Sequence, residues 1–338
     1  MQFHEKRRQQ FLGESMYQQS KTYLDLAIPA LEANLLENIK YPDSVTRLSM
    51  SIANDHFSRL QLEHTVGEPI ASMRMELERV IAIYERAGQF LWASTNDRNE
   101  PVFTFTSLDD YCQLMQLVGL CFLLHRRDLL PRLAALQDGL DTAGKPGDGN
   151  GGTDTLYEEF MAYGLGADVR YETNYLCCSK PYEALFHAIT ETSPAAALKE
   201  IDRFLKRWYK DLAGTGWHDS HKPNEGGDQG GYYGYWSFEA GAAVMLMNIE
   251  DDSSLYQYLY YPKDLVAWSR AHAGLSTNDD DASNAIRLRV LGGEACLKEG
   301  FWFTPARVNS RQHFKQGEVM PVVGGDYGAT IWQWDGQQ

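Results

Sequence analysis

Apolar residues recur every three or four positions through much of the N-terminal half of the chain. The clearest stretch is residues 69–94, where charged arginines and glutamates separate the apolar positions. This period is that of an amphipathic helix with one buried face, here about six turns long. The positions expected to be buried are Ile70, Met73, Leu77, Val80, Ile81, Tyr84, Ala87 and Leu91.

Neighbouring segments extend this helical pattern. Residues 107–130 open with Ser107 and Asp110, which resemble a capping box, and continue with apolar residues on most sides, so we expect a central, buried helix. Residues 20–39 have the same period but contain Pro29, which predicts a kinked or split helix. The intervening residues 40–69 are less periodic than their neighbours.

The glycine-rich segment "TAGKPGDGNGGTD" at 142–154 predicts a flexible connection between two helical parts. We therefore expect a helical domain over 1–143, a linker over 144–152 and a second helical domain over 153–292. In the second domain, Ser193, Pro194 and Gly214 bracket one helix, and residues 281–290 predict another.

The last part of the chain, 293–338, changes character. It contains Thr, Val, Phe and Trp, several glycines, and an alternating "TIWQW" run, which predicts a small β-rich or irregular appendage. The expected fold is therefore mainly α, a two-part, bundle-like helical architecture with this appendage.

The charge balance restricts the possible partners. The chain has 31 Lys and Arg against 46 Asp and Glu, a formal net charge of −15, and residues 144–290 are the most acidic part with 13 basic and 22 acidic side chains. Such a charge repels nucleic acid and anionic membranes, so we expect neither as a direct ligand. It allows either a solubilising surface or a surface suited to a basic partner protein.

Cysteine usage and hydropathy point to a cytoplasmic protein. The five cysteines form an odd set without a Cys-x-x-Cys motif, as expected in a reducing compartment. The N-terminal residues lack the apolar stretch of a secretory signal. The most apolar run, 114–124, is too short to span a bilayer.

Two constellations offer enzymatic alternatives. His218 and His221 invite a metal-hydrolase hypothesis, but they lie in a Gly/Asn-rich loop without helical spacing or an evident third ligand, so we expect no metal and no other cofactor. A helical carbohydrate-active hydrolase would use Glu239 and a second carboxylate, such as Asp219 or Asp228, in an aromatic cleft. Tyr235, Phe238 and Glu239 at helical spacing also fit a core stripe with one carboxylate, and we favour packing.

Residues 232–265, "YYGYWSFEAGAAVMLMNIEDDSSLYQYLYYPKDL", resemble the C-terminal domain of PoNi-type immunity proteins. Three blocks carry the resemblance: Gly-Tyr-Trp-x-x-Glu, then Asp-Asp-Ser, then Tyr-Tyr-Pro-x-Asp-Leu. The residues that match, which we assign mainly to the scaffold, are Tyr235, Trp236, Glu239, Asp252, Tyr261, Pro262 and Asp264. The tail after 293 resembles a module of other immunity proteins in polymorphic toxin systems.

The resemblance implies an all-α protein without enzymatic activity that binds and neutralises a cognate toxin. Such toxins are often DNases delivered by contact-dependent or type VI secretion systems, and a nuclease must present basic residues to hold phosphates. We therefore expect acidic side chains of the second domain to border the toxin contact. The candidates are Asp154, Glu158, Glu159, Asp279, Asp280 and Asp281.

Overall fold

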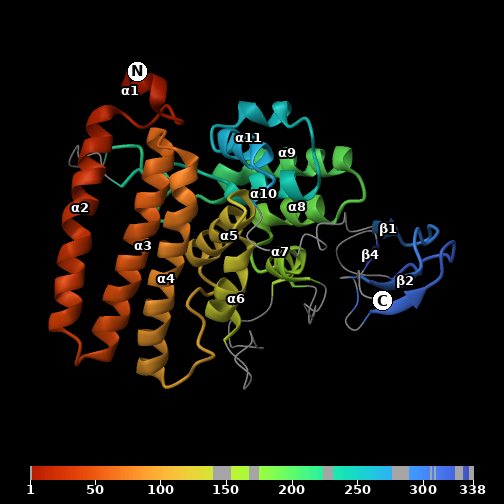
Figure 1. Ribbon diagram of the computed structural model, residues 1–338, viewed down its shortest axis with the longest axis horizontal. Coiled ribbons are helices and arrows are strands. Elements are labelled where there is room, and N and C mark those ends of the chain that lie inside the picture. Colours follow the sequence, from red (N-terminus) through yellow and green to blue (C-terminus); the bar gives the residue numbers. More distant parts are fainter. Residues whose placement is uncertain are drawn as a thin grey trace.

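Three long helices form a layer at one end of the molecule (Figure 1). The computed structural model describes residues 2–139, 154–166, 175–223, 231–275, 289–304, 307, 310–323 and 330–334. The layer consists of α2 (Glu14–Glu37), α3 (Pro42–Val66) and α4 (Ile70–Thr95), preceded by the short α1 (Phe3–Lys6). α3 packs between α2 and α4.

The two helices expected from periodicity agree with the structure. In α4, every apolar position expected to be buried is buried except Leu91, which is half-buried. α5 (Leu108–Leu123) begins at Ser107, whose Oγ accepts the N–H of Asp110 at 3.3 Å, and its side chains are buried nearly all round. A 3-10 turn, η1 (Arg127–Leu129), leads into α6 (Leu130–Asp138).

In the N-terminal half, one expectation needs correction and one segment without a clear prediction is now assigned. Pro29 does not split its helix, since α2 runs without interruption from Glu14 to Glu37. The weakly periodic segment 40–69 contains the full-length helix α3. Its start fits Pro42 in the first turn, and its end fits Gly67, which adopts a left-handed φ of 96°.

Helices also make up the second half. They are α7 (Thr155–Leu165), α8 (Ser179–Thr190), α9 (Pro194–Asp211), α10 (Phe238–Leu246), the 3-10 turn η2 (Ser253–Gln257) and α11 (Lys263–Ala271). α10 packs closely against α5, which joins the two halves through one continuous hydrophobic cluster. The expected linker 144–152 lies outside the described residues, and the two-domain division stays a prediction.

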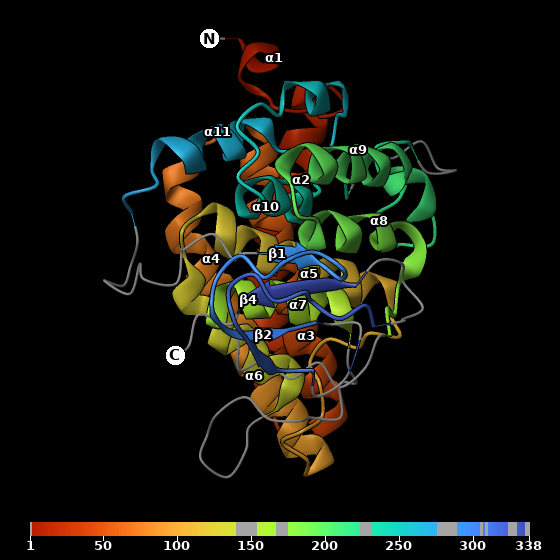
Figure 2. The ribbon, with the colours of Figure 1, turned by 90° about the vertical axis from the view of Figure 1, so that its right-hand side faces the viewer.

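The C-terminal part forms a small antiparallel sheet in the order β1-β4-β2-β3. Its strands are β1 (Arg289–Leu291), β2 (Gly300–Phe303), β3 (Gln312–Phe314) and β4 (Ile331–Trp334). Residues 289 and 290 were expected to be helical and lie in strand β1 instead, while the rest of that expected helix lies outside the described residues. Figure 2 shows the sheet in front of the helices.

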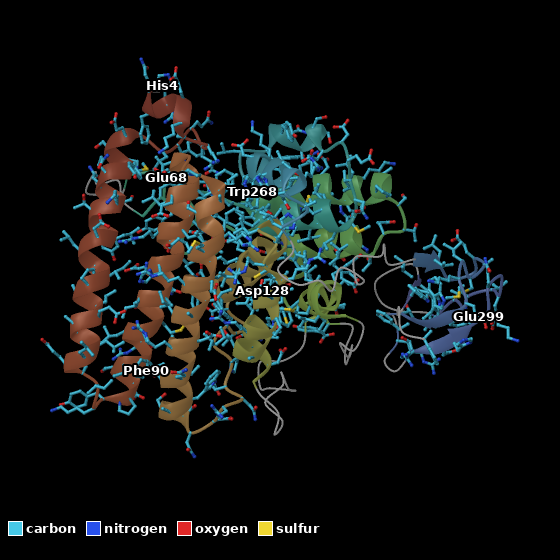
Figure 3. The ribbon with its side chains drawn as sticks, viewed as in Figure 1. His4, Glu68, Phe90, Asp128, Trp268 and Glu299 are labelled. Atoms are coloured by element: carbon cyan, nitrogen blue, oxygen red, sulfur yellow. The ribbon has the colours of Figure 1, made fainter. Side chains whose placement is uncertain are left out.

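We call residues 289–334 the β module. Its buried side chains form a cluster separate from the helical core, namely Val290, Cys296, Trp302, Phe314, Met320 and Trp332. Figure 3 shows Glu299 on this module, well apart from the labelled residues of the helices. The mainly α prediction with a β-rich appendage is confirmed. Within the described ranges, no helix is long and apolar enough to cross a membrane.

Candidate functional site

The aromatic segment at 231–239, which we call the aromatic seam, joins the two halves of the chain. Residues 231–237 are not helical, and α10 begins only at Phe238. Tyr235 therefore precedes the helix, and the expectation that it shares a helical stripe with Phe238 and Glu239 is wrong. Tyr235 and Trp236 are buried, so the seam is core.

The N-terminal segment binds the seam through Gln9, which is 1% exposed. Its side-chain amide donates to the carbonyl of Tyr235 at 2.5 Å and to that of Leu259 at 3.1 Å. Its Oε1 accepts the N–H of Tyr235 at 2.8 Å and the hydroxyl of Tyr232. One side chain thus satisfies polar groups from two distant segments of the second half.

α3 binds the seam from the other side. The Thr65 hydroxyl donates to the carbonyl of Tyr233 at 2.6 Å and accepts the indole N–H of Trp236 at 2.8 Å. The Gln116 amide on α5 donates to the carbonyl of Trp236 at 3.1 Å. The unpaired backbone of the seam is therefore satisfied by side chains from the first half.

Glu239 lies in the first turn of α10 and is fully buried. Its Oε1 accepts the indole N–H of Trp208 at 2.9 Å, whereas Oε2 has no hydrogen-bond partner among the described residues. Burial raises the pKa of Glu239 to about 7, because the charged form is poorly solvated there. The backbones of α5 and α10 also approach each other closely here, because a methyl group on Gly119 would lie 2.7 Å from the backbone nitrogen of Glu239.

Asp252, in the second motif block, is hydrogen-bonded to Tyr261 in the third block. It is 2% exposed and accepts hydrogen bonds from the hydroxyls of Tyr261 and Tyr256 and from Arg270 Nη1 at 2.8 Å. Burial and the Asp252 carboxylate raise the pKa of Tyr261. This cluster fixes the loop between α10 and α11.

Asp264 differs from the other motif residues because its side chain is 50% exposed. It lies 3.4 Å from Nε of Arg8, whose guanidinium also donates to the carbonyls of His64 and Glu68. Figure 3 shows Glu68 close to α1. The other six matched residues are buried, which is where scaffold residues belong.

The two histidines proposed for a metal are held by aromatic contacts. The His218 ring stacks on Tyr209 at 4.3 Å and the His221 ring stacks on Phe11 at 4.2 Å. His221 Nδ1 is 2.7 Å from the hydroxyl of Tyr235. Across the part of the chain that the structure describes, no three His, Cys, Asp or Glu side chains form a group able to hold a metal ion.

Residues 152–265 match the family model "PoNe immunity proteins (PoNi), C-terminal". We call this segment the PoNi domain after that match. It covers all three motif blocks, so the resemblance to PoNi-type immunity proteins is confirmed. The description of that family names immunity proteins.

A solved structure supports the fold beyond the PoNi domain. The crystal structure of protein PA2201 from Pseudomonas aeruginosa is 17% identical with a TM-score of 0.58, and the match covers 79% of this chain and 92% of that one. At this identity the likeness shows a shared fold. None of the curated proteins compared with the chain matches it significantly.

Within the PoNi domain, three of the expected contact carboxylates lie in the interior. Asp154 and Glu159 are fully buried and Glu158 is 7% exposed. Asp154 caps α7, accepting the N–H groups of Tyr157 at 2.9 Å and Cys177 at 2.8 Å and the hydroxyl of Tyr111 at 2.9 Å, and burial raises its pKa.

The structure therefore contradicts a surface role for these three side chains, which were expected on the surface only from their charge. Burial along α7 follows from its packing against α6 and α8. Asp279, Asp280 and Asp281 lie outside the described residues, so their part of the expectation stays a prediction.

A hollow beside the aromatic seam is too small for a sugar. The hollow lined by Trp208, Trp217, Tyr235 and Trp236 has a volume of about 30 Å³, enough for one or two water molecules. Glu239 itself is not accessible to solvent. These observations count against the carbohydrate-hydrolase alternative, which requires two carboxylates facing a substrate cleft.

Sequence reasoning missed several residues that organise the PoNi domain. Gln9 and Thr65 lie more than 160 positions from the seam, and a single polar residue in a helical region gives no signal of so distant a partner. The sequence pattern also did not single out Glu250 and Asp251, two exposed acids next to the Asp252 cluster.

Proposed function

We propose that the chain is a cytoplasmic immunity protein, without enzymatic activity, that binds and inhibits a DNA-degrading toxin delivered by a type VI or comparable contact-dependent secretion system. The observation that carries this proposal is the PoNi match over 152–265, whose family description names immunity. The proposal adds the kind of toxin, the route of delivery and the compartment.

The charge of the chain supports a DNA-binding toxin as the partner. A toxin that cleaves DNA needs Lys and Arg to hold phosphates, and a net charge of −15 attracts such a surface. Attraction also speeds association, which matters because the toxin must be captured before it reaches the genome.

The proposed acidic contact has two parts, an exposed acidic loop and the acidic run at 279–281. Glu250 and Asp251 project from a loop that the buried Asp252 holds in place through Arg270 and two tyrosines. A fixed loop loses little conformational entropy on binding. Asp279, Asp280 and Asp281 remain part of the proposed contact.

The first experiment is co-expression with the toxin domain encoded beside the gene for this chain, followed by co-purification and a DNA-degradation assay. We expect a stable complex in which the nuclease is inactive. A toxin that cleaves DNA at full rate in the presence of excess immunity protein would contradict the proposal. A toxin that is inhibited but attacks another substrate would contradict only the DNase assignment.

A charge-reversal variant tests the acidic contact. Replacing Glu250, Asp251, Asp279, Asp280 and Asp281 with lysine should weaken binding and reduce its dependence on salt, because attraction to a basic surface is lost. Reversal of Glu14, Glu37 and Asp43, which are exposed at the N-terminal end of the chain, is the control. Equal affinity and salt dependence in both variants would remove the acidic residues from the contact.

A further inference from the structure

Helix α9 presents a basic stripe on an otherwise acidic chain. Five exposed side chains, Lys199, Arg203, Lys206, Arg207 and Lys210, lie at steps of three or four residues or directly adjacent. At 100° per residue they share about a quarter of the helix circumference, along roughly 16 Å of its length. We call this set the α9 stripe.

The stripe is only partly neutralised by its own helix. Arg203 lies 2.9 Å from Glu200 and Arg207 lies 2.7 Å from Asp211. Lys199, Lys206 and Lys210 form no ion pair with any carboxylate in the described ranges. Elsewhere in the helical part many basic side chains are paired, as in Arg86 with Glu32 and Arg132 with Glu85.

The opposite face of α9 holds the stripe rigidly. Ile201, Phe204, Leu205 and Trp208 are fully buried, and α9 packs along α8. Ser193 caps the helix by accepting the N–H of Ala196 at 3.2 Å. Figures 1 and 2 show α9 at the outer edge of the PoNi domain, above α8. The lysines therefore project from a fixed platform.

The surroundings favour a compact acidic ligand over a long polyanion. At physiological salt, mobile ions screen the interaction between charges more than about 8 Å apart, so a ligand confined to the stripe interacts mainly with the charges of the stripe itself. A DNA duplex or an anionic membrane would extend past the stripe onto a protein with a net charge of −15. A carboxylate patch on a partner protein fits the stripe without that repulsion.

We propose that the α9 stripe docks a carboxylate-rich patch on the toxin, as a second contact of opposite sign to the acidic one. The inference rests on the proposed function for the identity of the partner. A metal-dependent nuclease has such a patch, because Asp and Glu carboxylates hold its divalent ions, and lysines that pair with them compete with the metal. In this proposal the immunity protein recognises both charge signs of a metal-dependent nuclease site.

The test compares two triple variants of the full chain with equal changes of net charge. The first is Lys199→Glu, Lys206→Glu and Lys210→Glu; the control is Lys40→Glu, Arg47→Glu and Arg98→Glu, all exposed on the N-terminal half. Binding to a catalytically inactive toxin is measured at about 0.15 M ionic strength and at higher salt. Thermal melting and circular dichroism check that both variants fold like the wild type.

We expect the α9 variant to raise Kd about 100-fold or more, because like charges then face each other across the contact, while the control stays within a few-fold of the wild type. The neutral variant with Gln at the same three positions should fall between the two. It should also show a weaker salt dependence than the wild type.

Three outcomes would overturn the inference. If the wild type binds the toxin and the α9 variant binds equally well, the stripe is not a contact, and the proposed function stands. If the wild type shows no binding or protection, the proposed function fails together with the inference. If the wild type binds a DNA duplex and only the α9 variant loses that binding, the stripe recognises nucleic acid instead.

Discussion

At the scale of single residues, Glu239 shows how a family motif can hold a titratable group in the core. A carboxylate with one buried oxygen bonded to Trp208 and the other unpartnered is more costly charged than neutral. The motif Gly-Tyr-Trp-x-x-Glu therefore specifies a packing arrangement with a protonation equilibrium. Nothing in the residue pattern alone distinguishes this arrangement from a catalytic acid in a cleft.

This burial predicts a pH-dependent stability. Folding raises the pKa of Glu239 from 4.5 to about 7. The stability that this group contributes is therefore fully present below the pKa of the unfolded chain and is lost as the pH rises through about 7. Glu239→Gln keeps an acceptor for Trp208 and cannot ionise. Between about pH 4.5 and 8, we expect the free energy of unfolding measured by urea denaturation to fall by about 2–3 kcal/mol less in the variant than in the wild type.

The comparison of unfolding free energies between the wild type and Glu239→Gln isolates this group, since the other groups titrate in both proteins. Equal slopes of unfolding free energy against pH in the wild type and Glu239→Gln would mean that Glu239 is solvated or differently paired. Toxin binding should be retained by the variant, because this side chain lies in the interior.

At the scale of elements, the short segment that carries Gln9 contributes more to the architecture than its length indicates. α1 and the residues after it cross from α3 to the seam, with Arg8 bonded to carbonyls at the end of α3 and Gln9 bonded to Tyr235 and Leu259. The segment therefore holds the end of the helical layer against the PoNi domain.

A pair of adjacent glutamines tests this function of the segment. Gln9→Ala leaves buried backbone groups of Tyr235 and Leu259 without partners, so we expect a loss of about 2–4 kcal/mol in unfolding free energy. Gln10→Ala, at an exposed neighbouring position, should change it by less than about 0.5 kcal/mol. Equal effects in chemical denaturation would show that water replaces the Gln9 amide.

The elements also show what the sequence could predict. α4 and α5 were predictable because their burial follows the helical period and a serine cap. α3 was weakly periodic, since buried polar residues such as Ser49, His64 and Thr65 interrupt its apolar face. The three motif blocks found by resemblance lie within the segment that the family model matches, whereas local spacing placed Tyr235 on α10, which begins three residues later.

Which acidic side chains are exposed could not be predicted from composition. Net charge says how many carboxylates a chain has, and burial depends on packing that involves distant residues. Asp154 is an N-cap whose partners include Tyr111 on α5, 43 positions away. The basic stripe of α9 was equally hidden, because its five charges are spread over twelve positions and become one surface only on a helix.

At the scale of the whole molecule, the described residues form a helical body with a large main core and a smaller cluster between α2 and α3, and a β module with a core of its own. The body's cluster includes residues from α2 through α11, and the module's cluster shares none of them. Cooperative unfolding depends on shared buried contacts, so the two parts should differ in their stability to local opening.

Removing one buried tryptophan from each core tests whether the two parts open separately. Trp332→Ala removes a fully buried side chain from the β module, at a cost of about 3–5 kcal/mol to that cluster. We expect hydrogen exchange to rise in β1–β4 while α5 and α10 keep their protection. Trp208→Ala removes a fully buried side chain from the helical body and should instead expose α9 and α10.

The same pair of variants tests whether the β module takes part in toxin binding. Both proposed contacts lie outside the module, the acidic residues before β1 and the stripe on α9. If those contacts suffice, Trp332→Ala should bind the toxin within a few-fold of the wild type even with an opened sheet. A loss of binding with an intact helical body would show that the module itself contacts the toxin.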